Sequence, residues 1–186
     1  MNYSDIRAGI RTGDLIAFRK KHGLLAMLTR WITKSPYTHT ALVIWVGLGE
    51  ERRLLVAEQK ASGAFLTPLS QYAGDDFDVF DAPHEVLIDV GEMIWKTLGQ
   101  PVCYDVFDLL RIAANRLIGW PLPKRDDANL VCSALSATIW LKSGWQPRWP
   151  LPSIPAPDDV VSALGVPPVL QFRPVDPWRR LSENLQ

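Results

Sequence analysis

Residues 38–46 read THTALVIWV, a stretch dominated by the β-branched and aromatic residues that favour a strand. Shorter stretches of similar character surround it, and turn signals at Gly13-Asp14 and Ser62-Gly63 punctuate them. They are LIAFR (15–19), RLLVAE (53–58), the segment around 64–67 and FDVFDA (77–82). The first half of the chain therefore predicts a series of strands joined by turns.

The second half changes to helical periodicity, in which apolar residues recur every three to four positions. Glycines follow four of these segments, as expected at helix ends. Helices are predicted over 86–98, 104–118, 131–143 and 157–164, with an earlier one over 23–33 and a last strand over 169–173. Strands first and helices later predict an α+β domain, in which an antiparallel sheet packs against helices.

Length and composition predict one globular domain over 1–186, with its core at about 12–173. The formal net charge is zero, which argues against broad electrostatic binding of nucleic acid or of an anionic membrane. No apolar run approaches the roughly 18 residues of a membrane span, and the N-terminus lacks the features of a signal peptide. We therefore expect a cytoplasmic protein with reduced thiols.

The chain has two cysteines, Cys103 and Cys132, too few for a disulfide framework or a zinc site of four cysteines. A single bridge between them is the alternative that a reducing compartment disfavours. Cys132 follows a polar loop with potential helix caps at Asp126, Asp127 and Asn129. In the first turn of a helix, a cysteine lies where the helix dipole favours thiolate and backbone N–H groups can hold an oxyanion. The alternative is a small buried core residue.

His39 and Glu58 lie on strands predicted to be neighbours. His39 opens its strand and shares a face with Ala41 and Val43. An imidazole on a strand beside a helix N-terminus suits a thiol–imidazole pair. Glu58 ends the next strand and could accept a hydrogen bond from that imidazole, whereas alternation points Gln59 to the opposite face. The alternatives are a polar strand edge for His39 and a solvated strand end for Glu58.

Tyr104 begins the helix predicted over 104–118, after a proline-containing turn. Its phenol could donate to a substrate carbonyl, or it could pack with its hydroxyl in water. His22, in a basic run, and His84, in a turn, have no comparable context.

Five segments together resemble, in order, the pattern of YiiX-like enzymes, which are circularly permuted members of the NlpC-type, papain-like superfamily. They are GDLIAFR, SPYTHTALVIW, LLVAEQKASGAFLTPLSQY, PVCYDVFDLL and LVCSALSATIW. The resemblance spans about residues 12–160, and the histidine strand precedes the cysteine helix, as in the permuted group. It implies Cys132 as nucleophile, His39 as base and Glu58 as the residue that orients the base. It also places Tyr104 near the site, while Cys103 is an additional thiol that departs from the pattern.

The resemblance implies attack of the Cys132 thiolate on an amide or ester carbonyl, without a metal or organic cofactor. A peptidase or amidase acting on a cell-wall-derived peptide is the leading hypothesis; recycled fragments, or delivery by lysis as for a phage enzyme, would bring it to such a substrate. A lipid-directed acyl hydrolase or acyltransferase is the second, because the permuted group also resembles the lecithin:retinol acyltransferase relatives. The segment GLLAMLTRWI (23–32), flanked by basic residues, would then make a peripheral membrane contact, or it packs in the core. A non-catalytic binding domain is the third hypothesis.

Overall fold

The computed structural model describes residues 3–19, 30–31, 33–60, 63–99, 106–121 and 131–174. Its strands form one six-stranded antiparallel sheet in the order β4-β3-β2-β1-β5-β6. The strands are β1 (Leu15–Phe18), β2 (His39–Val46), β3 (Arg53–Lys60), β4 (Gly63–Pro68), β5 (Phe77–Phe80) and β6 (Leu170–Phe172). The predicted α+β class is confirmed.

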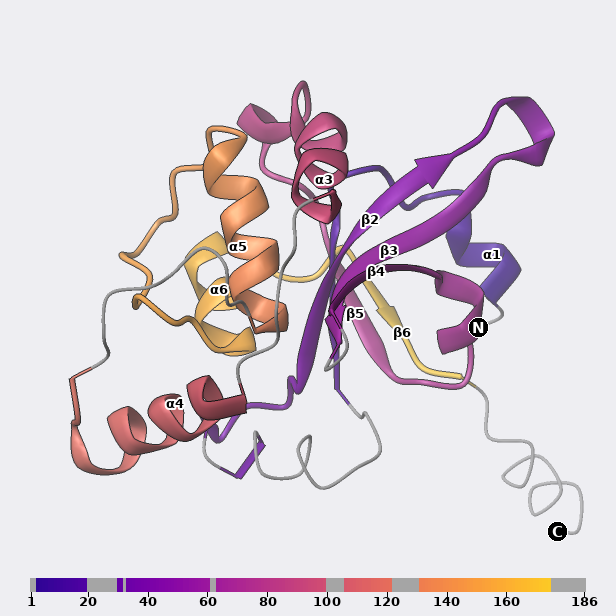
Figure 1. Ribbon diagram of the computed structural model, residues 1–186. Helices are drawn as coiled ribbons and strands as arrows, with labels where there is room; N and C mark the ends of the chain where they lie inside the picture. The colour runs from indigo at the N-terminus through magenta and orange to yellow at the C-terminus, as the bar shows by residue number, and fades with distance from the viewer. Residues whose placement is uncertain are drawn as a thin grey trace, which may run out of the picture.

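Helices cover both faces of this sheet. Figure 1 shows α3, α5 and α6 on one side of the sheet and α1 on the other, with α4 apart at the lower left. The α-helices are α1 (Tyr3–Arg7), α3 (Val90–Leu98), α4 (Val106–Ile118), α5 (Cys132–Lys142) and α6 (Pro157–Leu164). Short 3-10 turns are η1 (Gly49–Glu51), η2 (Leu69–Tyr72) and η3 (His84–Val86).

Most predicted elements are confirmed within one or two residues, but the helix predicted over 86–98 begins only at Val90. Leu87 and Ile88 are exposed, so they do not belong to its buried stripe. The sequence did not predict α1, and β3 runs two residues further than expected, to Lys60. The predicted helix 23–33 lies largely outside the described residues.

Alternation along the strands divides the core into two parts. On the first side, which we call the α5 face, sheet residues pack with residues of α5 such as Leu135 and Trp140. These sheet residues include Leu15, Ala17, Leu42, Ile44, Ala57 and Phe80. On the second side, the α1 face, sheet residues pack with Ile6 of α1 and Leu69 of η2. They include Ile16, Phe18, Ala41, Val43, Val56 and Phe77.

Helix α5 runs in the same direction as β2. Near the helix C-terminus, Trp140 Nε1 donates to the carbonyl of Gly13 (3.0 Å), and the N–H of Gly13 donates to the carbonyl of Val43 (2.8 Å). Nearer the N-terminus, Ser136 Oγ lies 3.4 Å from Thr40 Oγ1. The first turn of α5 therefore lies where β2 begins and the antiparallel β3 ends, which we call the His39 end of the sheet.

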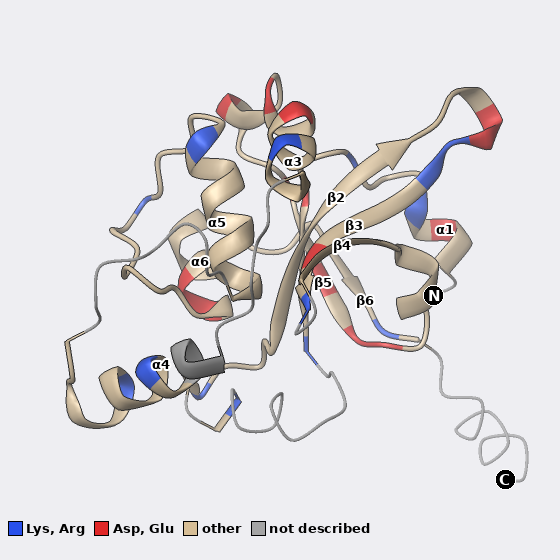
Figure 2. Ribbon diagram, in the orientation of Figure 1, with Lys and Arg blue, Asp and Glu red and all other residues tan. Residues whose placement is uncertain are grey.

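Charged side chains also gather at the opposite end of the β2–β3 hairpin. Figure 2 shows acidic and basic residues at the tip of the β2–β3 hairpin, which contains Glu50, Glu51, Arg52 and Arg53. By contrast, Lys142 is the one charged residue of α5. Within the described ranges, no helix is long and apolar enough to cross a membrane.

Candidate active site

A buried imidazole–carboxylate pair joins β2 to β3. His39 Nε2 lies 2.8 Å from Glu58 Oε2. Glu58 is fully buried and His39 is 7% exposed. The β2–β3 register has Leu42 opposite Ala57, and its continuation makes His39 a diagonal neighbour of Glu58 on the α1 face. The contact expected between these strands is therefore present.

Two further side chains hold the other oxygen of Glu58. The Tyr72 hydroxyl donates to Glu58 Oε1, and Lys60 Nζ lies 3.1 Å from the same atom. Lys60 also donates to Thr67 Oγ1 at 3.0 Å. Burial, followed by the hydrogen bond to Glu58, raises the pKa of Tyr72, so its phenol stays protonated and keeps donating. The carboxylate is thus bound through both oxygens.

The sequence interpretation missed both of these residues. Lys60 lies two positions after Glu58, so strand alternation could have placed it on the same face. Tyr72 is 14 positions from Glu58 and comes from η2, a short turn that no periodicity marks. Phe18 completes the surroundings, because its ring lies 5.6 Å from that of His39 and 4.7 Å from that of Tyr72. This aromatic packing shields the pair from water and strengthens its hydrogen bonds.

Cys132 is the first residue of α5, as the sequence predicts. The N-cap is Val131 and makes no side-chain capping bond, while the expected caps Asp126, Asp127 and Asn129 lie outside the described residues. No acidic residue occupies the first turn, so nothing there offsets the positive end of the helix dipole. Ser133 Oγ donates to the carbonyl of Pro155 (2.6 Å) and anchors this turn. The position favours a thiolate.

Cys132 and His39 border the same end of the sheet from different sides. Alternation places His39 on the α1 face, whereas α5 covers the opposite face. His39 is the first residue of the interior strand β2 and therefore lies at one end of the sheet. Cys132 is 8% exposed, similar to His39, whereas Thr40 between them is fully buried. Cys132 and His39 thus both lie at the His39 end of the sheet, and both keep slight access to solvent. Tyr104 and Cys103 lie outside the described residues.

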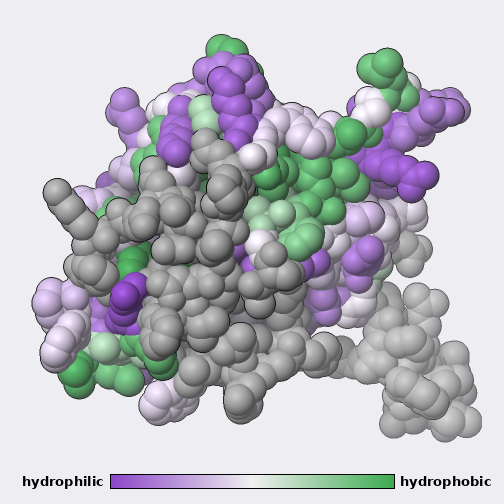
Figure 3. Space-filling view, viewed as in Figure 1, coloured by the Kyte–Doolittle hydropathy of each residue, from purple (hydrophilic) through white to green (hydrophobic). Residues whose placement is uncertain are grey.

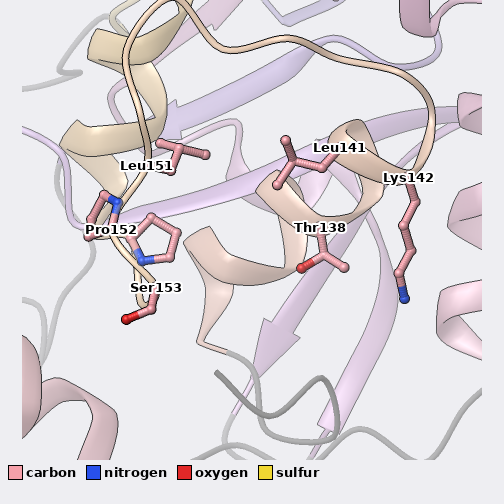
Figure 4. Close-up of a pocket in the computed structure, with 7 residues that line it drawn as sticks. Thr138, Leu141, Lys142, Leu151, Pro152 and Ser153 are labelled. Atoms are coloured by element: carbon pink, nitrogen blue, oxygen red, sulfur yellow. The ribbon is translucent and has the colours of Figure 1, made fainter. Parts of the chain in front are cut away.

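A separate groove of about 370 Å³ lies beside the C-terminal half of α5. Figure 4 shows Thr138, Leu141 and Lys142 of α5 along one side and the loop residues Leu151, Pro152 and Ser153 along the other. Its helix residues are six to ten positions beyond Cys132, on a different side of the helix. The groove therefore does not belong to the site formed by His39 and Glu58.

The architecture has a counterpart among solved structures. The fold is similar to that of the metalloprotein YiiX from Escherichia coli O157:H7 (DUF1105), with a TM-score of 0.51 and 19% sequence identity. The match covers 72% of this chain and 66% of the YiiX chain, just under two thirds of its length. No protein-family model matches the sequence, and no curated protein matches it. At this identity the likeness concerns the fold alone.

YiiX is a metalloprotein, whereas the site described here offers few ligands for a metal ion. The described part of the chain contains no group of three or more His, Cys, Asp or Glu side chains that could hold one. Both oxygens of Glu58 already bind other side chains. The described residues of the site therefore do not fit a metal centre.

Proposed function

We propose that this protein is a cysteine hydrolase with a permuted papain-like, NlpC-type arrangement of Cys132, His39 and Glu58. The buried His39–Glu58 pair carries the proposal, because it lies at the end of the sheet where Cys132 begins α5. A carboxylate bonded to an imidazole selects one tautomer, orients the ring and stabilises the imidazolium. Tyr72 and Lys60 keep that carboxylate in place.

In the proposed reaction, Glu58 binds Nε2–H of His39, so Nδ1 takes the proton of the Cys132 thiol. The thiolate attacks the carbonyl carbon of an amide, and backbone N–H groups at the start of α5 bind the oxyanion. Nδ1–H then protonates the leaving nitrogen, the C–N bond breaks and a thioester remains. Water attacks the thioester while His39 accepts its proton, which releases the acid and restores the thiol.

A cell-wall-derived peptide is the proposed substrate, and a lipid acyl group is the second candidate. The observation that favours the lipid is the apolar surface of α4 and the residues after it. Ile118 and Trp120 are 72% and 62% exposed, and Leu110 and Leu117 are also exposed, with Arg116 on the same helix. Figure 3 shows apolar surface at the lower left, over α4. An exposed apolar stripe with nearby cations suits the surface of a bilayer.

Alkylation with iodoacetamide at pH 6 tests the activated thiol. An ordinary thiol is less than about 1% ionised at this pH, whereas a thiolate at a helix N-terminus beside an imidazolium is largely ionised. We expect Cys132 to react at least about tenfold faster than Cys103, measured by mass spectrometry of the two peptides. Equally slow reaction of both would support the non-catalytic binding domain instead.

Hydrolysis of a γ-D-glutamyl dipeptide, compared with fatty-acid release from phospholipid vesicles, distinguishes the two substrate classes. Cys132→Ala should abolish whichever activity is present, while Cys103→Ala should retain it. Activity that survives Cys132→Ala would refute the assignment of the nucleophile.

A further inference from the structure

Gln59 is a buried polar residue that the proposed mechanism does not use. It is the penultimate residue of β3 and only 2% exposed. Its Nε2 donates to the carbonyl of Lys60 at 3.5 Å, the outer limit of a hydrogen bond. Its Oε1 is buried and has no donor among the described residues. Native proteins rarely leave such an acceptor unmatched, so Gln59 calls for an explanation.

The strand register locates this amide on the α5 face at the His39 end. Leu42 lies opposite Ala57, and the same antiparallel register two residues further places Thr40 opposite Gln59. Thr40 Oγ1 lies 3.4 Å from Ser136 Oγ, which in turn lies 3.4 Å from the carbonyl oxygen of Cys132. Gln59 is therefore close to the first turn of α5, on the side of the sheet that the Cys132 helix covers.

The neighbouring side chains of β3 and β4 offer no hydrogen-bond donor to Gln59 Oε1. Lys60 points to the α1 face, where its ammonium binds Glu58 and Thr67. Across the next strand pair, Gln59 lies opposite Ala64, whose side chain has no donor. The unmatched oxygen instead lies in the part of the molecule where a substrate would meet the nucleophile.

We propose that Gln59 is a substrate-binding residue whose Oε1 accepts a hydrogen bond from an N–H of the molecule held at Cys132. This inference rests on the proposed function and deepens it. A peptide presents an N–H next to its carbonyl groups, whereas the corresponding ester oxygen can only accept. A buried acceptor discriminates strongly against a ligand that lacks the donor. With an ester, Gln59 Oε1 and the ester oxygen face each other and neither has a hydrogen-bond donor. Gln59 thus selects amide-containing substrates over ester-containing acyl lipids.

Two alkylating probes that differ at one position test this role. The first is chloroacetyl-glycine methylamide, and the second is its ester analogue, in which oxygen replaces the N–H next to the chloroacetyl group. Their rates at Cys132 are divided by their rates with glutathione, which removes the difference in intrinsic reactivity. We expect the wild type to prefer the amide about tenfold, and Gln59→Met, of similar size but without the acceptor, to lose this preference.

Gln146→Met is the matched control, because Gln146 is exposed beyond the C-terminus of α5 and should leave the preference unchanged. N-ethylmaleimide, which has no N–H, reports the reactivity of Cys132 itself. If Cys132 is no faster than Cys103 with N-ethylmaleimide at pH 6, the proposed function fails and this inference fails with it. If Cys132 is activated but Gln59→Met keeps the amide preference, the role of Gln59 alone is overturned. The role of Gln59 is also overturned if the wild-type protein shows no preference for the amide probe. This result does not depend on whether Gln59→Met folds.

Discussion

Two fully buried carboxylates lie in this sheet, and their surroundings differ. Glu58, on the α1 face, is bound by an imidazole, a phenol and an ammonium. Asp78, on the α5 face, is bound by two guanidinium groups and a phenol. Arg19 Nε and Nη2 lie 2.9 and 2.6 Å from Oδ2, Tyr37 donates to the same oxygen at 2.8 Å, and Arg173 Nη2 lies 2.6 Å from Oδ1.

The partners decide what each carboxylate can do. Burial by itself would raise the pKa of Asp78, but hydrogen bonds from Arg19, Arg173 and Tyr37 outweigh it and lower that pKa. Arginine does not lose its proton in this setting, so the Asp78 cluster keeps its charges and serves to hold β1, β5 and β6 together. The Glu58 cluster contains an imidazole, which can accept and release a proton. The Asp78 cluster therefore suits a structural role, and the Glu58 cluster suits proton transfer.

Glu58→Gln should produce the largest effect on chemistry. The neutral amide cannot stabilise an imidazolium, so the rate of Cys132 alkylation at pH 6 should fall by about 10- to 100-fold. Glu51→Gln, at the exposed tip of the β2–β3 hairpin, is the matched control and should not change the rate. Circular dichroism of the same sample reports loss of folding. An unchanged rate for Glu58→Gln would remove Glu58 from the mechanism.

Asp78→Asn should instead act on stability. Removing one partner of a buried ion cluster leaves two guanidinium groups without their carboxylate, which costs about 3–5 kcal/mol of unfolding free energy. Urea unfolding measures this loss, and alkylation of Cys132 in the folded variant should stay within about threefold of the wild type. Asp81→Asn, which breaks the exposed pair with Arg11, should cost less than about 1 kcal/mol. A large loss of Cys132 reactivity in Asp78→Asn would mean that both clusters serve the site.

The same cluster predicts a pH dependence of stability. Because folding lowers the pKa of Asp78, its stabilisation is fully present above the ordinary value of about 4 and is lost as the pH falls through the folded-state pKa. The difference in unfolding free energy between wild type and Asp78→Asn should be constant from pH 7 to about pH 5 and shrink below about pH 4. A difference that stays constant into the acid range would contradict this assignment.

Strand alternation explains why much of this site could be predicted. It places His39 and Glu58 on one face of adjacent strands, and Gln59 on the other. Tyr72 could not be found this way, because a 3-10 turn 14 residues away carries it to Glu58. Nor could alternation tell which face α5 covers, since that depends on how the helix packs after a loop. The catalytic roles of Cys132, His39 and Glu58 and the substrate-binding role of Tyr104 stay predictions.

The local sequence pattern could not predict the surroundings of Asp78 either. In FDVFDA (77–82), Asp78 shares a strand face with Phe80 and Ala82, so the local pattern does not tell whether its carboxylate is buried. Arg19 and Arg173 come from the residues directly after β1 and β6 and neutralise the buried charge. The strands β1, β5 and β6 are far apart in the sequence, and the order of the sheet brings them together. A local sequence pattern carries no information on that order.

Tyr72→Phe and Tyr37→Phe make the finest comparison, because each removes one phenol that donates to a buried carboxylate. Losing one such hydrogen bond should cost each variant about 1–2 kcal/mol of stability. Only Tyr72→Phe should also slow alkylation of Cys132, by about three- to fivefold, because Glu58 then holds His39 less firmly. Plotting the rate against pH separates the two variants. A shift of the profile in Tyr72→Phe, with no shift in Tyr37→Phe, shows that the phenol acts through the imidazole. Equal profiles would mean that Tyr72 supports only the fold, and that the two carboxylates differ less than their partners suggest.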